Sequence, residues 1–222
     1  MKRFVVFLIL ALASWILPVK AQAPNRELNG LLDDVDRNFA QMKDFSAEFL
    51  QITMSSKTNL NQTRMDDGHL YLAKGHKMRF VYSQPERWWV SNGKSVYSYD
   101  SEERIWTQEP VKESTADMWP LMYLVGQSGL KKNFYITQLT RKPSIPGNLV
   151  VELQLKKKNE DIKRIEIEID PQRKLIVWMA IVDMNDLSNQ FMFRNIRTNS
   201  NIADSMFEFT PPAGARKVQG SK

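Results

Sequence analysis

The sequence predicts a mainly β fold, in which one antiparallel meander curves strongly or nearly closes on itself and two apolar helices accompany it. Strand-like alternation after Asp44 is the first reason, and it is clearest in residues 164–169, where isoleucines alternate with charged side chains. Tight-turn signals such as Asn92-Gly93 separate the alternating segments. The length of 222 residues suits one domain with a full core and is too short for two comfortable ones.

Two segments are expected to form helices. Residues 25–43 carry an apolar stripe at helical spacing, made of Leu28, Leu31, Leu32, Val35, Phe39 and Met42. Residues 114–125 form a shorter segment that is apolar on most sides, and its stripe consists of Met118, Leu121, Met122 and Val125, with Leu124 beside it. A curved sheet has a concave face that something must fill, and these helices are the candidates.

The strands are expected in two groups, before and after the second helix. The first group covers residues 45–50, 69–72, 78–82, 88–91, 94–100 and 105–109, and the second covers about 133–140, 149–156, 162–169, 175–182 and 189–198. Asn92-Gly93 is the strongest hairpin signal, with a positive φ expected at both residues. Tight connections between successive strands favour a single meander. Residues 207–214 contain two consecutive prolines and are expected along a sheet edge.

The N-terminus has the layout of a secretory signal peptide. Lys2 and Arg3 precede an apolar run over 4–17, and small residues follow. The run is shorter than the roughly 20 residues that a membrane span needs. We expect cleavage after Ala21, although an uncleaved anchor is the alternative interpretation. The signal peptide is thus residues 1–21 and the single mature domain residues 22–222, which predicts an exported protein.

Charge and cysteine content narrow the function classes. The formal charge of +6 includes Lys2, Arg3 and Lys20, so removal of residues 1–21 leaves +3. The chain has no cysteine, which excludes disulfides, thiol catalysis and lipid attachment to a cysteine. A second long apolar segment is lacking, so we expect no stable membrane insertion.

Catalytic and metal-binding patterns are weak. The two histidines, His69 and His76, have lysines nearby and are expected to face solvent rather than bind metal. Residues 126–129 have the wrong spacing for a nucleophile elbow. Residues 156–158 are three lysines, which suit a solvated strand end better than a docking site for an acidic or membrane partner. We therefore expect no enzyme, no cofactor, no metal and no nucleic-acid partner.

Soft apolar residues are abundant instead. Eleven methionines include Met1, and aromatic residues concentrate between residues 80 and 123. Methionine adapts to variable apolar guests, although ordinary core filling explains such a composition more often. A single curved sheet with two short helices has room for an apolar hollow, so both interpretations stay open.

Four segments resemble the periplasmic outer-membrane lipoprotein carrier family of the LolA type. They are DFSAEF at 44–49 with Gln51, GHLYL at 68–72 with MRFVYSQP at 78–85, VSNGKSVYSYD at 90–100, and FEFTPPAG at 207–214. Their order and spacing hold over nearly the whole mature chain, and the second and third together are quite specific.

The resemblance implies an incomplete barrel of about eleven antiparallel strands with a helical lid over an apolar cavity. It implies that acyl chains of lipoproteins enter this cavity in the periplasm. An inner-membrane ABC transporter would supply them and an outer-membrane receptor would accept them. We expect a monomer.

Candidate site residues follow from this resemblance and from strand alternation. By position, Phe45, Phe49, Phe80 and Tyr82 line the sheet side. The other cavity candidates are Leu70, Met78, Trp89, Tyr97, Ile165, Ile167, Met179, Phe191 and Phe193. The lid candidates are Met118, Leu121, Met122, Leu124 and Val125.

The chain departs from the family at the residue expected to latch the lid. Well-known carriers have an Arg-Pro after the strand that ends at Leu72 here, and that arginine holds the lid shut. Lys74-Gly75 occupies the place in this chain, and lysine lacks the planar fork of donors. Arg79 is a substitute, but its position predicts an outward side chain.

Two rival functions use the same fold. One is the binding of other amphiphiles, such as phospholipids or glycolipids. The other is an interaction module that senses lipoproteins for a partner, although such proteins usually carry an additional domain and this chain ends at Lys222.

Overall fold

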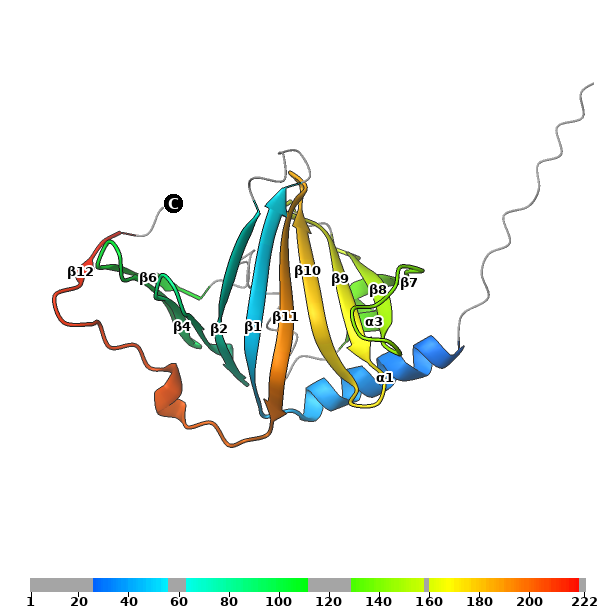
Figure 1. Ribbon diagram of the computed structural model, residues 1–222. Helices are drawn as coiled ribbons and strands as arrows, with labels where there is room; N and C mark the ends of the chain where they lie inside the picture. The colour runs from blue at the N-terminus through cyan, green and yellow to red at the C-terminus, as the bar shows by residue number, and fades with distance from the viewer. Residues whose placement is uncertain (1–25, 56–62, 112–128, 158–159, 220–222) are drawn as a thin grey trace, which may run out of the picture.

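The computed structural model describes residues 26–55, 63–111, 129–157 and 160–219, which form one open, twelve-stranded sheet with few helices (Figure 1). The helices are α1 (Arg26–Gln41), α3 (Leu130–Asn133) and η2 (Asp204–Phe207). The strands are β1 (Asp44–Ser55), β2 (Arg64–Ala73), β3 (Lys77–Tyr82), β4 (Arg87–Asn92), β5 (Ser95–Asp100), β6 (Ile105–Pro110), β7 (Phe134–Gln138), β8 (Leu149–Leu155), β9 (Ile162–Asp170), β10 (Leu175–Asp183), β11 (Leu187–Thr198) and β12 (Arg216–Lys217). The mainly β prediction is confirmed.

The sheet joins the two expected strand groups into one. Its order is β12-β6-β5-β4-β3-β2-β1-β11-β10-β9-β8-β7. Consecutive strands are neighbours within β1–β6 and within β7–β11, as a meander requires. The two groups meet where β1 pairs with β11, with Phe49 opposite Phe193. The twelfth strand is the two-residue β12, which lies parallel to β6 at the sheet edge.

The hairpin between β4 and β5 forms where the sequence predicts it, but with a different turn. Gly93 has a φ of +87°, whereas Asn92 is not among the residues with positive φ. Asn92 instead closes the turn with its side chain, whose Oδ1 accepts the N–H groups of Lys94 and Ser95 at 3.0 Å. The expectation of a positive φ at both residues was wrong for Asn92. Its side chain stabilises the turn through Asx-type hydrogen bonds, so the turn does not need a positive φ there.

Alternate residues of each strand point to an inner face, which we define as the face that α1 covers. The predicted helical stripe is confirmed, and Leu28, Leu31, Leu32, Val35 and Phe39 are all buried. Figure 1 shows α1 lying across one end of the sheet, near the start of β1. The Asn38 amide fastens it there by donating to the Lys174 carbonyl at 3.0 Å in the β9–β10 turn. Burial of the apolar stripe supplies most of its stability, because so short a helix is marginal in water.

The opposite, outer face is partly covered by a C-terminal strap, residues 199–217. The strap begins at the buried Asp44 carboxylate, which accepts the N–H groups of Ser200 at 2.7 Å and Asn201 at 2.9 Å. Further along, the Phe209 ring stacks on Tyr97 with centroids 4.9 Å apart. The strap ends as β12 at the edge of the sheet. Residues 207–214, which were expected along an edge, precede this strand, and Phe209 lies over the outer face of β4–β6 instead.

A second buried carboxylate holds the loop between β7 and β8. Glu168 is fully buried on the outer face and accepts hydrogen bonds from Ser144, Ile145 and Asn148. Burial by itself would raise the pKa of the Glu168 carboxyl, but these hydrogen bonds outweigh it and hold the pKa below its ordinary value.

Candidate functional site

An aromatic cluster occupies the inner face of β1, β3 and β11. The Phe49 ring lies 5.4 Å from Phe80, 5.1 Å from Tyr82 and 6.2 Å from Phe191, centroid to centroid. These rings meet across β2 because Gly68 stands between Phe49 and Tyr82 in the register. A Cβ at Gly68 would lie 3.0 Å from the Phe49 ring and 2.0 Å from the Val81 carbonyl oxygen. Gly68 therefore leaves the space that lets the cluster form.

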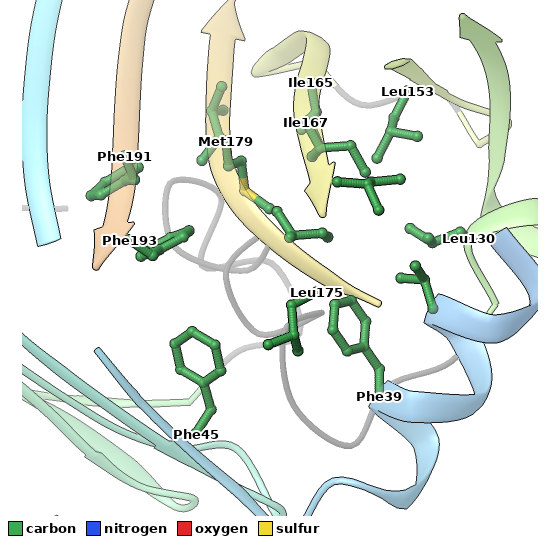
Figure 2. Close-up of a cluster of buried hydrophobic side chains, with 14 of the residues drawn as sticks. Phe39, Phe45, Leu130, Leu153, Ile165, Ile167, Leu175, Met179, Phe191 and Phe193 are labelled. Carbon is green, nitrogen blue, oxygen red and sulfur yellow. The ribbon is translucent and has the colours of Figure 1, made fainter. Parts of the chain in front are cut away.

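An aliphatic cluster continues the same face on the other side of β11. Met179 of β10 lies opposite Ile167 of β9, which lies opposite Val151 of β8. Figure 2 shows Met179 and Ile167, and it shows Phe39 of α1 beside Leu175. All are buried in one apolar core that runs from the aromatic cluster to α1. The inner face is thus apolar over most of its width.

Most of the candidate cavity residues lie together in this core. The structure buries Phe45, Phe49, Leu70, Met78, Phe80, Tyr82, Ile165, Ile167, Met179, Phe191 and Phe193 in the same cluster. Trp89 belongs to the same face, because it pairs with Phe80, yet 40% of its surface is exposed. Trp89 is therefore an apolar side chain of the inner face that the protein leaves accessible.

Tyr97 differs from the expectation. It lies opposite Val90, which lies opposite Arg79, and this row belongs to the outer face. Its ring stacks on Phe209 of the strap. The hairpin register places Ser98 rather than Tyr97 opposite Trp89, because successive strand residues point to opposite faces.

The expected lid residues Met118, Leu121, Met122, Leu124 and Val125 lie outside the described residues. The two latch candidates have other partners. Lys74 donates through Nζ to the Ala40 carbonyl at 3.0 Å, at the C-terminal end of α1. Arg79 points outward as expected, and its guanidinium donates to the Met206 carbonyl at 3.3 Å and lies over Trp88. Lys74 thus holds α1, while Arg79 holds the strap.

A charged group borders the aromatic cluster, and sequence reasoning missed it. Asp66 is buried and pairs with Arg64 at 2.8 Å and with Arg87 at 2.7 Å. The Arg87 guanidinium lies 4.7 Å from the Tyr82 ring centroid. Asp66 lies within β2 and on the inner face, opposite Gln51 of β1. Counting the alternation of β2 back from Leu70 through Gly68 would have placed Asp66 on the inner face, although not its pairing with Arg87.

The Tyr82 hydroxyl connects the aromatic and polar parts of the inner face. It donates to Gln51 Oε1 at 2.8 Å. The pKa of Tyr82 is raised to about 12, chiefly because burial disfavours the phenolate; Arg87 opposes this shift and Asp66 adds to it. Tyr82 is therefore a neutral hydrogen-bond donor at ordinary pH.

The described residues contain little that suggests catalysis. His69 and His76 are both exposed, as expected. Within the described ranges, no group of three or more His, Cys, Asp or Glu side chains is arranged to hold a metal ion. In that same part of the chain, no helix has the length and apolar character needed to cross a membrane. What the site offers is apolar contact over a broad face, with a charged group at its border.

Known proteins resemble this chain over nearly its full length. An outer-membrane lipoprotein carrier protein of Methylococcus capsulatus is 24% identical over 216 residues, covering 96% of this chain and 97% of its own. One of Azotobacter vinelandii is 25% identical over 221 residues, covering 99% and 100%. Among solved structures, an uncharacterized conserved protein from Thermus thermophilus aligns with a TM-score of 0.53 at 10% identity, covering 87% of this chain and 99% of its own.

A family model gives the most specific match. The model described as "Outer membrane lipoprotein carrier protein LolA" matches residues 40–210, which include the inner-face clusters and most of the strap. The matched region covers well over half of the sequence, and the open, mainly β sheet agrees with it. The chain belongs to the LolA family of outer membrane lipoprotein carrier proteins.

Proposed function

We propose that this protein is a periplasmic carrier that holds the acyl chains of lipoproteins against the inner face of its sheet. In this proposal an inner-membrane ABC transporter supplies the cargo and an outer-membrane receptor accepts it. The signal peptide proposed for residues 1–21 would direct export and then be cleaved off. The lid proposed for residues 114–125 would cover the bound chains, and the carrier would act as a monomer.

The observation that carries this proposal is the continuous apolar inner face, with Trp89 left 40% exposed on it. Hydrocarbon burial is worth about 0.8 kcal/mol per CH₂ group, so a few acyl chains supply tight binding without any covalent chemistry. Release requires that part of this gain be offset. Opening the proposed lid would expose apolar surface on the lid and on the sheet. This cost would offset part of the gain from binding and leave a modest net affinity for the acyl chains.

The test is a Trp89→Ala variant in an uptake assay with fluorescently labelled lipoprotein. Because Trp89 contributes accessible apolar surface to the inner face, we expect roughly tenfold weaker uptake. The free energy of unfolding should change by less than about 1 kcal/mol, because the side chain is already partly exposed.

The matched control is Tyr135→Ala, which removes an aromatic side chain 62% exposed on β7. It should leave uptake unchanged, because Tyr135 lies on the outer face, between Phe134 and Ile136 of the inner one. Equal uptake of the same lipoprotein without its acyl chains would contradict the proposal, and so would normal uptake by Trp89→Ala.

A further inference from the structure

The inner face changes from apolar to polar along the strands. β1 starts near α1 and runs away from it, as Figure 1 shows. Along it, Phe45, Ala47 and Phe49 are followed on the same face by Gln51 and Thr53. Thr53 donates to Asn189 Oδ1 of β11 at 2.8 Å. An amphiphile with its chains on the apolar part therefore places its head group at the polar end.

At the polar end, Arg64, Asp66 and Arg87 form an ion-paired group. It contains two positive charges and one negative charge. Asp66 is buried, and its one carboxylate serves both guanidinium groups. Asp100 lies opposite Arg87 on β5, but its Oδ1 accepts the N–H groups of Glu102 and Glu103 in the next turn. In the described part of the chain, no ion pair joins Asp100 to Arg87. Among the described residues, one positive charge of the group has no matching carboxylate.

Arg87 is placed to meet a ligand that lies on the aromatic cluster. It reaches Asp66 on β2 from β4 by crossing over the Tyr82 ring of β3. Its Nε is buried and has no hydrogen-bond partner among the described residues. A buried donor without a partner is costly, and guanidinium donors match the oxygens of carboxylate and phosphate. A purely structural ion pair would explain the contacts with Asp66 but not the unused donor.

We propose that Arg64, Asp66 and Arg87 form a head-group site for an oxyanion, a carboxylate or phosphate, attached to the hydrocarbon chains that lie on the inner face. This inference rests on the proposed carrier function. Asp66 orients the two guanidinium groups, and Arg87 meets the oxyanion where the apolar surface ends. The two sources of this chemistry are a lipid phosphate and an acidic residue beside the acylated end of a peptide.

The experiment compares amphiphiles that differ only in the head group. Affinities are measured for hexadecyl phosphate and hexadecanol, and for a palmitoylated peptide with one Asp and its Asn counterpart. The wild-type protein should bind hexadecyl phosphate roughly tenfold more tightly than hexadecanol, the size expected for one charged hydrogen bond. The preferred source is whichever pair, phosphate against alcohol or Asp against Asn, shows the larger ratio.

Removing a positive charge and removing the negative charge of the group should change the preference for the oxyanion in opposite directions. Arg87→Gln should abolish the preference for the oxyanion, and Asp66→Asn should increase it, while hexadecanol binds all variants equally. Arg197→Gln, which removes the same charge from an exposed position on β11, is the control and should behave as wild type. The free energy of unfolding of each variant separates misfolding from lost recognition.

The outcomes distinguish the two proposals. If hexadecanol binds but none of the proteins prefers an oxyanion, the head-group site is wrong and the carrier proposal stands. If neither hexadecanol nor the palmitoylated peptides bind, the carrier proposal fails as well. A preference that Arg87→Gln leaves intact would place the oxyanion elsewhere and overturn the inference.

Discussion

The inner face of β8–β10 and the inner face of β4–β6 are built differently. On β8–β10, branched aliphatic side chains such as Ile167 belong to the same apolar core as the buried face of α1 and are fully buried. On β4–β6, the inward row that contains Trp89 continues into Ser98 and Thr107, whose hydroxyls share a 2.6 Å hydrogen bond. One region is thus a finished core, while the other presents an exposed indole and small polar groups.

This contrast locates stability and binding in different places. A helix that buries an aliphatic surface contributes free energy of folding, and that surface is closed to a ligand while the helix stays in place. A surface with an exposed aromatic side chain gains that free energy only when something covers it. The β8–β10 region should therefore respond to mutation through stability, and the β4–β6 region through binding.

The largest expected effect tests this division directly. Phe39→Ala removes a ring that is 1% exposed between α1 and the sheet. It should lower the free energy of unfolding by about 3–5 kcal/mol, as measured by urea denaturation. If Trp89→Ala destabilised the protein as much, the two regions would be equivalent and the contrast would be wrong.

An intermediate effect is expected at the strap, which gives the β4–β6 region a core on its outer face. The Phe209 ring contacts Tyr97, Trp88 at 6.4 Å and Trp106 at 5.5 Å. Phe209→Ala should cost about 1–3 kcal/mol, since the ring is only half-buried. Amide hydrogen exchange should quicken in β5 and β6 and not in β9.

The control for this prediction is Ile145→Ala, which truncates a side chain 54% exposed in the loop between β7 and β8. It should leave both the free energy of unfolding and the exchange pattern nearly unchanged. Faster exchange in β9 than in β5 after loss of Phe209 would show that the strap does not hold the β4–β6 region.

The strap also shows where prediction from sequence stops. Period-two alternation suffices to place Phe49 and Ile167 on one face, because both lie in long strands with a clean pattern. Tyr97 sits in a segment where aromatic, hydroxyl and aliphatic residues alternate, so the pattern does not reveal its face. The ring that covers it, Phe209, comes from far along the chain, and no local signal links the two.

The charged group illustrates the same limit for the site. Asp66 and Arg87 are separated by a complete strand, and their pairing depends on the registers of β2 with β3 and β3 with β4. A shift of one residue in either register would turn one of them to the outer face. Alternation within single strands therefore predicts most of the apolar lining residues. The head-group site cannot be predicted in this way, because it depends on how the strands pair in the assembled sheet.

The smallest expected effect concerns Tyr82, at the border between the aromatic cluster and the charged group. Tyr82→Phe leaves Gln51 Oε1 without its donor and should cost about 1 kcal/mol near neutral pH. The pKa of Tyr82 is raised to about 12 from the ordinary 10.0, chiefly by burial, so the unfolded chain loses this proton first as pH rises. Its contribution to stability is therefore complete below pH 10 and declines between pH 10 and about 12.

Two measurements check this prediction. Phenolate absorbance during an alkaline titration of the folded protein should show an ionisation step near pH 12, a step that Tyr82→Phe removes. The loss of stability above pH 10 should be shallower in the variant than in wild type. If the step that the variant loses lies near pH 10 instead, Tyr82 is open to solvent, and the polar end of the inner face is not shielded from water.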